Sequence, residues 1–165
     1  MAIVFPGGTQ TAPAKIIGAT SNNTTTQATF GTNSWGELPM TLTYTPSTTS
    51  SKLLVAYSFT VSSDHGNDLT FLCQRNGSSI FVGSGGNVNG IGNVGVGHSG
   101  TWVGEQVTLT FIDSPSSTSA QTYRFFGYLQ SGQNSSNNWR VNVSRASGSD
   151  GYACQTTGYI LELNS

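Results

Sequence analysis

The two histidines offer the widest choice of chemistry in this chain, and each has one reactive neighbour. His65 follows Asp64, and His98 precedes Ser99. A histidine beside a carboxylate or a hydroxyl can serve as a general base. However, Ser99 is not in the Gly-x-Ser-x-Gly elbow that exposes a nucleophilic serine. The seven carboxylic acids are scattered, mostly at turns, and none forms the facing pair that glycoside hydrolysis requires. We therefore expect no catalytic residue and no enzyme activity.

The cysteines and the glycine-rich segment predict neither a metal nor a cofactor. Cys73 and Cys154 lie in strand-like runs, where they are either buried thiols or one disulfide between neighbouring strands. Two cysteines without a nearby histidine do not make a zinc site. The segment Gly90–Gly95 has the spacing of a dinucleotide-binding fingerprint, but no helical periodicity follows it.

Aromatic residues flanked by amides and hydroxyls favour binding over catalysis. Their rings can stack on sugar faces, while Asn, Gln and Ser can hydrogen-bond sugar hydroxyls. Two such sets occur: Trp139 with Tyr128 around the polar segment 130–138, and Trp102 with His98 at the glycine-rich segment. These four residues are candidate glycan contacts. The alternative, which the sequence leaves open, is that the tryptophans are core or interface residues.

Composition predicts one β-domain. A chain of 165 residues can bury about two-thirds of its unfolded surface. Only 8% of the residues are charged and the net charge is −1, which excludes the basic footprint of a nucleic-acid-binding protein. Three tryptophans, six tyrosines and eight phenylalanines favour a packed domain over disorder. The sequence contains no run of about 18 apolar residues, so we expect no membrane span. The apolar stretch at the first five residues is too short for the core of a signal peptide.

Two similar segments, 41–61 and 108–129, dominate the middle of the chain. Each has a strand, a turn with proline and Ser/Thr, and a second strand, which predicts an antiparallel hairpin. Two such hairpins predict an antiparallel β-sandwich of two similar halves. Alternation along the rest of the chain gives about ten strands and no helix, with a short first strand at 15–19, a polar loop at 20–26 and a terminal strand at 159–163.

The alternation also predicts the core. One face of the most apolar strand carries Leu53, Val55, Tyr57, Phe59 and Val61, and a later strand presents Trp139, Val141 and Val143 on one face. Between them, Asn76-Gly77 is the preferred centre of a type I′ turn, so the strands on either side should pair as a hairpin.

The two least regular segments are candidate contact regions. Residues 1–14 predict an extended arm before a single head domain at 15–165, and the apolar start of this arm is a candidate docking segment: Ile3, Val4, Phe5 and Pro6. The glycine-rich segment carries apolar residues that are unusual in a solvated loop and are candidate subunit-interface residues: Val88, Ile91, Val94 and Val96.

Four segments, in order, resemble the virion-fibre head domains of bacteriophages, cyanophages especially. The first is Tyr-Thr-Pro-Ser-Thr-Thr-Ser-Ser-Lys-Leu-Leu-Val at 44–55, and the second is Gln-Arg-Asn-Gly-Ser-Ser-Ile at 74–80. The third is Ile-Asp-Ser-Pro-Ser-Ser-Thr-Ser-Ala-Gln-Thr-Tyr at 112–123. The fourth comprises 139–145 and the ending Gly-Tyr-Ile-Leu-Glu-Leu at 158–163.

The resemblance implies a trimeric, jelly-roll-like knob on a virion appendage, assembled in the cytoplasm of the infected host. It predicts a short tail-fibre or receptor-binding head that contacts the host surface, with a host glycan as a candidate partner. The expected protein partners are further copies of the chain and, through the N-terminal arm, baseplate, tail or capsid proteins. Because few residues precede the match, a capsid decoration or baseplate connector with a purely structural role is the alternative.

Overall fold

The computed structural model describes residues 15–63, 67–80, 90–96, 103–129, 138–143 and 153–164, and within these residues it contains strands and no helix. The expected all-β class is therefore confirmed. The strands are β1 (Ile16–Thr24), β2 (Ala28–Phe30), β3 (Trp35–Tyr44), β4 (Lys52–Ser63), β5 (Asn67–Arg75), β6 (Ser78–Ile80), β7 (Gly92–Val96), β8 (Val103–Asp113), β9 (Gln121–Leu129), β10 (Trp139–Val141) and β11 (Thr156–Leu163).

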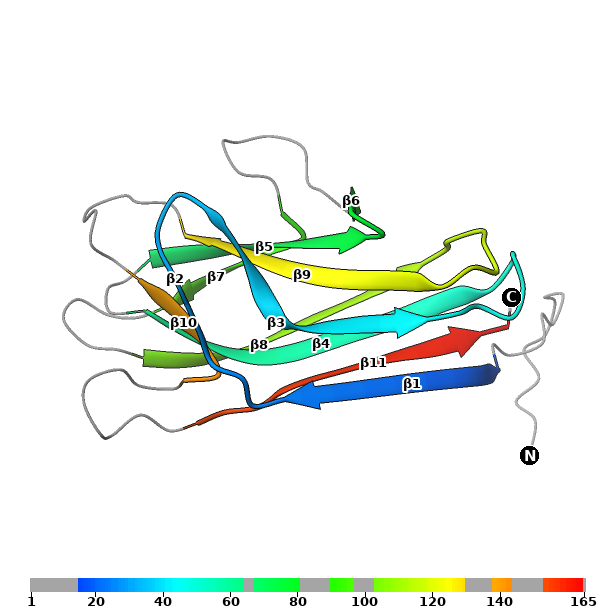
Figure 1. The fold of residues 1–165 in the computed structure, drawn as a ribbon, viewed down its shortest axis with the longest axis horizontal. Coiled ribbons are helices and arrows are strands. Elements are labelled where there is room, and N and C mark those ends of the chain that lie inside the picture. Colours follow the sequence, from blue (N-terminus) through cyan, green and yellow to red (C-terminus); the bar gives the residue numbers. More distant parts are fainter. Residues whose placement is uncertain are drawn as a thin grey trace, which may run out of the picture.

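Two antiparallel sheets pack face to face (Figure 1). The first, sheet A, has the order β1-β11-β4-β8. The short strand β10 pairs with the C-terminal end of β4, and β2 pairs with β10. The second, sheet B, has the order β3-β9-β5, and β5 then pairs with both β6 and β7. The chain crosses between the sheets at each step from β2 to β5 and again from β7 to β10, whereas β5–β7 stay in sheet B and β10 and β11 stay in sheet A. The predicted β-sandwich is thus confirmed.

The two similar segments are crossovers between the sheets, so their prediction as hairpins was wrong. β3 and β4 flank the turn 45–51, but β3 pairs with β9 in sheet B while β4 pairs with β8 in sheet A. β8 and β9 likewise flank the turn 114–120 and cross in the opposite direction. Each segment therefore pairs with the other, strand by strand, and the two form one interlocked unit instead of two halves.

The core lies between the sheets, where the predicted residues meet. All five predicted side chains of β4 are fully buried, as are Trp139 and Val141, and Val143 is 7% exposed. Tyr57 of sheet A stacks on Phe125 of sheet B with ring centroids 4.1 Å apart. Buried residues alternate with more exposed ones along β9 and β11, as burial of one face per strand requires.

Local predictions mostly held, with one exception at the start of the fold. Asn76 and Gly77 both have positive φ (50° and 84°) and join β5 to β6, which confirms the type I′ hairpin. In contrast, the expected loop at 20–26 is largely strand, because β1 pairs with β11 as far as Thr24. No disulfide joins Cys73 and Cys154, of which the first is buried and the second half-buried.

Candidate functional site

The outer face of sheet B holds the candidate site. On β9, Phe125 and Leu129 point into the core, so Arg124, Phe126 and Tyr128 point outward. The strand register aligns outward residues of β3 and β5 with them in two rows: Trp35–Tyr128–Thr70 and Glu37–Phe126–Leu72. We define the aromatic face as Trp35, Glu37, Leu72, Arg124, Phe126 and Tyr128.

Two rings form the apolar part of this face. Trp35 is 38% exposed, and its ring centroid lies 5.3 Å from that of Tyr128 at an interplanar angle of 49°. Phe126, half-buried, is the next outward residue on β9 and lies beside the well-buried Leu72 of β5. A rigid sheet thus holds three aromatic side chains with few rotatable bonds, so a ligand that contacts them would order little of the protein.

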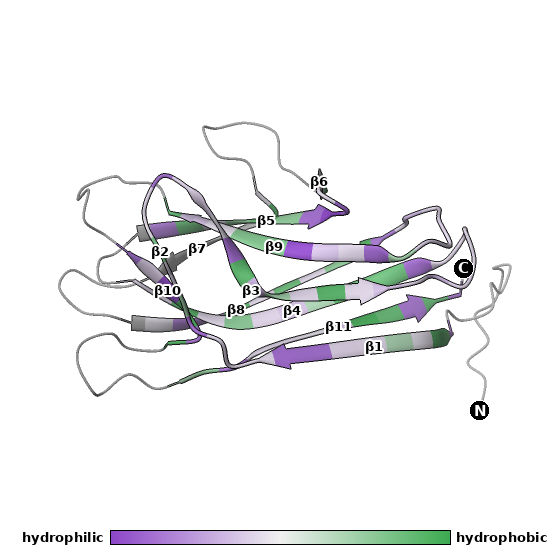
Figure 2. Cartoon of the chain, in the orientation of Figure 1, coloured by the Kyte–Doolittle hydropathy of each residue, from purple (hydrophilic) through white to green (hydrophobic). Residues whose placement is uncertain are grey.

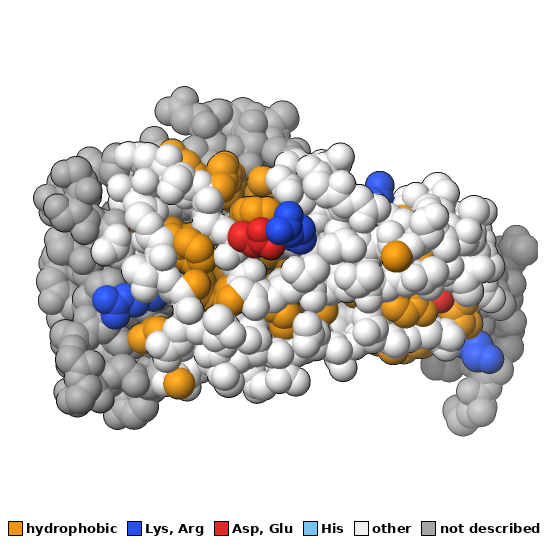
Figure 3. All heavy atoms as spheres, viewed as in Figure 1, with side chains coloured by type: hydrophobic (Ala, Val, Ile, Leu, Met, Phe, Trp, Pro, Cys, Tyr) orange, Lys and Arg blue, Asp and Glu red, His pale blue; other side chains and the backbone are white. Residues whose placement is uncertain are grey.

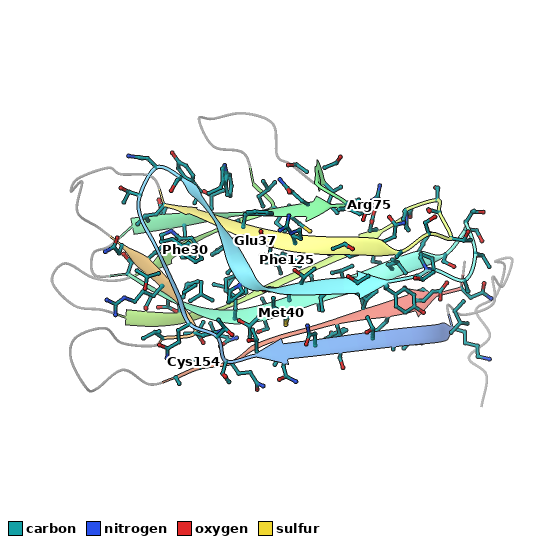
Figure 4. The ribbon with its side chains drawn as sticks, in the orientation of Figure 1. Phe30, Glu37, Met40, Arg75, Phe125 and Cys154 are labelled. Atoms are coloured by element: carbon teal, nitrogen blue, oxygen red, sulfur yellow. The ribbon has the colours of Figure 1, made fainter. Side chains whose placement is uncertain are left out.

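An exposed ion pair borders the rings. Arg124 donates from Nε to Oε1 of Glu37 at 2.8 Å, and its Nη2 lies 2.7 Å from Oε2, so the pair is bidentate. Their side chains are 44% and 36% exposed, so the pair adds little to stability. Figure 4 labels Glu37 on β3, and at this position Figure 3 shows an acidic and a basic side chain side by side with hydrophobic side chains gathered next to them. The guanidinium and carboxylate keep further donors and acceptors directed at solvent.

This combination suits recognition and not bond breaking. Tyr, Trp, Phe and Arg are the residues enriched at protein interfaces, where aromatic anchors and arginine supply most of the binding energy. The rings offer flat apolar surface and the ion pair offers oriented polar groups at its border. A ligand with both an apolar face and hydroxyls, such as a pyranose, matches the two parts together.

Two of the four predicted glycan contacts lie in the described residues, one on the outer face of the sandwich and the other in its core. Tyr128 is on the aromatic face. Trp139 is instead a core residue with 0% exposure; its ring stacks near Phe30 with centroids 4.4 Å apart, so it cannot contact a ligand. The sequence had left this alternative open, and packing between β10 and β9 decides it. Trp102 and His98 lie outside the described residues, as do Asp64, His65 and Ser99.

The sequence reasoning missed Trp35 and Phe126. Alternation with the buried Leu38 and Met40 does place Trp35 and Glu37 on the outer face of β3, so one signal was present. The missing information was that β3 pairs with β9. Only this pairing brings Trp35 next to Tyr128, which lies far along the chain.

The candidate interface and docking residues are described only in part. Ile91 is half-buried and packs against the chain's own core, and its amide donates to the Phe71 carbonyl at 2.7 Å. β7 contains Val94 and Val96, but their side chains lie outside what the structure describes, as do Val88 and the arm residues Ile3, Val4, Phe5 and Pro6. Their proposed roles remain predictions.

A buried carboxylate attaches the first crossover turn to the last strand. Glu162 of β11 accepts hydrogen bonds from the Ser47 amide and hydroxyl, the Ser51 hydroxyl and the Tyr44 hydroxyl. Burial tends to raise the pKa of this carboxyl, but the hydrogen bonds outweigh burial and lower the pKa from 4.5 to about 2. Because the partners all come from the chain, the cluster is structural.

A second buried carboxylate occupies the other crossover. Asp113, at the end of β8, accepts two hydrogen bonds of 2.7 Å from Nη1 of Arg75 and one of 2.6 Å from the Tyr123 hydroxyl. Burial, with the charge of Asp113 as a smaller effect, raises the pKa of the nearby Cys73 thiol to about 12. A thiol with so high a pKa is not a nucleophile at neutral pH.

Metal clusters and membrane-spanning helices are both absent from the part of the chain that the structure describes. No cluster of three or more His, Cys, Asp or Glu there could hold a metal ion. No helix that could cross a membrane is found in that part either. Comparison with protein families and with curated proteins finds no match to this chain.

Proposed function

We propose that this chain is a bacteriophage virion protein, a short trimeric tail-fibre or receptor-binding head that contacts the host surface through the aromatic face. The exposed ring of Trp35 and the half-buried rings of Tyr128 and Phe126, beside the Glu37–Arg124 ion pair, carry the proposal. The sequence resemblance supplies the virion context. The two-sheet β-sandwich is compatible with it, since viral and lectin domains include sandwiches of the jelly-roll type, although a fold alone does not fix a function.

A bacterial surface polysaccharide is the host ligand that the face fits best. Its sugar rings have apolar faces that match the exposed rings, and its hydroxyls match the ion pair. The described part of the face has few charges and only partly exposed rings, so binding should depend on several shallow contacts repeated along a polymer. Several heads on one appendage would then add avidity to weak single sites.

The test is binding of the full-length protein to a panel of immobilised bacterial capsular and O-antigen polysaccharides. Trp35→Ala and Tyr128→Ala should each weaken binding at least tenfold, about the effect of removing an aromatic anchor. Thr43→Ala, an exposed change farther along β3, is the matched control and should bind as the wild type does. Unaltered binding by both aromatic variants would refute the assignment of the face.

The structural alternative makes a different prediction. A capsid decoration or baseplate connector would bind virion proteins, and the exposed apolar residues of sheet A described below favour an assembly role of this kind. Under this alternative the protein binds none of the polysaccharides but binds virions, or purified capsid or baseplate particles. The Trp35→Ala variant should bind these particles as the wild type does.

A further inference from the structure

The exposed large hydrophobic side chains of the described residues are concentrated on sheet A. Four of the five belong to its strands: Ile16 at 55% exposure, Ile17 at 43%, Ile112 at 52% and Tyr159 at 42%. The fifth, Trp35, belongs to the aromatic face on sheet B. A soluble domain tolerates single exposed apolar residues, but a group of them on one face marks an interaction surface.

The strand register joins these residues into one patch on the outer face. One row runs across all four long strands as Ala19–Leu161–Leu54–Ile112, and the adjacent row runs as Ser21–Tyr159–Ala56–Thr110. The inward neighbours Val55 and Ile160 are fully buried in the core, so the side chains of both rows point away from it. Figure 2 shows the hydrophobic start of β1 beside β11. Ile17, two residues before Ala19 on β1, joins the patch there. We define the sheet A patch as Ile17, Ala19, Leu54, Ile112, Tyr159 and Leu161.

The surroundings of the patch restrict its partner. Among the described residues, the outward positions next to it on β1, β4, β8 and β11 are Ser, Thr or Asn apart from Ala56 and Leu163, and Lys52 is the charged residue among them. A strongly charged partner would lose water from its charges here without gaining opposite charges. A second copy of the same face matches the patch in polarity, because it too has an apolar centre with a nearly uncharged, hydroxyl-rich border.

The size of the face also fits a second copy. Four strands about 4.8 Å apart, over about nine residues of 3.4 Å each, give the face a plan area of roughly 600 Å². A standard interface buries about 800 Å² of accessible surface per partner, and a corrugated sheet exposes more surface than its plan area. The face can therefore supply most of a stable contact.

We infer that copies of this chain associate through the sheet A patch, with the patch of one copy packed against sheet A of the next. This contact leaves the aromatic face free on the opposite side of the sandwich. Two identical patches packed face to face would close a dimer, so the trimer proposed above requires the patch to contact a different part of sheet A on the next copy. The inference does not depend on what the aromatic face binds.

The test is the mass of the full-length protein by multi-angle light scattering at micromolar concentration. The wild type should give a multiple of 17.3 kDa, and Ile112→Lys and Tyr159→Lys should each shift the mass to that of one chain. Both positions are exposed, so the variants should keep the strand signal and the cooperative melting of a folded domain. Thr43→Lys adds the same charge to the outer face of sheet B and should keep the wild-type mass.

A second measurement needs no variant. Because the patch is nearly uncharged, raising NaCl from 50 mM to 1 M should leave the wild-type mass unchanged or raise it, whereas charge-driven association would weaken. A wild type of single-chain mass, or lysine variants that keep the wild-type mass, would overturn the inference. Polysaccharide binding by the monomeric variants separates this result from the proposed function, since each single site should persist without assembly.

Discussion

Replacing Glu162 with glutamine should remove one of the strongest polar attachments in the fold. Its carboxylate accepts a hydrogen bond of 2.7 Å from the Ser47 amide and one of 2.8 Å from the Tyr44 hydroxyl, besides those from the hydroxyls of Ser47 and Ser51. A glutamine cannot accept them all, because its NH₂ group only donates. The fall in the carboxyl pKa from 4.5 to about 2 corresponds to about 3 kcal/mol of stability at pH 7.

The sign of the pH dependence follows from the direction of the shift. The folded-state pKa of Glu162 lies below the unfolded value, so its stabilisation is present above pH 4.5 and is lost as the pH falls towards about 2. By pH 3 more than half of the roughly 3 kcal/mol should be gone. Glutamine does not titrate, so wild type and Glu162→Gln should differ most in unfolding free energy at pH 7 and converge near pH 2.

Urea unfolding followed by tryptophan fluorescence at pH 7, 5, 4 and 3 measures this difference at fixed protein concentration. Comparing the two proteins at each pH cancels the titration of the other carboxylates. Glu37→Gln, which breaks an exposed ion pair, is the control and should cost less than about 1 kcal/mol. The reasoning fails if Glu162→Gln lies within about 0.5 kcal/mol of wild type at pH 7, or if the difference is constant down to pH 3.

Two further predictions concern the core. A Cβ on Gly127 would lie 2.4 Å from the buried ring of Trp139, so Gly127→Ala should lower the urea unfolding free energy by about 1–3 kcal/mol, whereas Gly31→Ala, with open space around it, should change little. In Cys154→Ser, which leaves one thiol, the buried Cys73 should react with a disulfide reagent at pH 8 only as fast as the domain unfolds. Reaction within the mixing time in the absence of denaturant would contradict this burial.

The two outer faces of the sandwich have different proposed roles, ligand binding on sheet B and self-association on sheet A. The aromatic face on sheet B combines rings with an oriented ion pair, which suits a ligand that has both apolar and polar groups. The sheet A patch combines aliphatic side chains with hydroxyls, which suits another copy of the chain. Because the two sheets share one core, the same alternation of side chains that fills the interior also fixes what each outer face displays.

The candidate site was only partly accessible from the sequence. Tyr128 was identified because polar residues follow it, and Trp35 could have been placed outward from the alternation along β3. Trp139 has similar polar neighbours in the sequence, yet it is buried against Phe30 and Gly127. Neighbours in the chain do not reveal whether a ring is covered, since strands from elsewhere in the chain do the covering.

The sequence by itself determined the all-β class, the buried face of β4 and the hairpin turn at Asn76-Gly77, although it did not reveal that β1 extends to Thr24. The alternation that placed Leu53 to Val61 in the core and the Asn76-Gly77 turn are properties of a few adjacent residues, and local geometry is enough to read them. Only the tertiary structure decided that the turns 45–51 and 114–120 cross between sheets instead of closing hairpins. A turn rich in proline and serine permits both paths, and the choice depends on burying two apolar faces against each other, which involves strands far apart in the chain. The aromatic face exists for the same reason, because it is assembled by the pairing of β3 with β9.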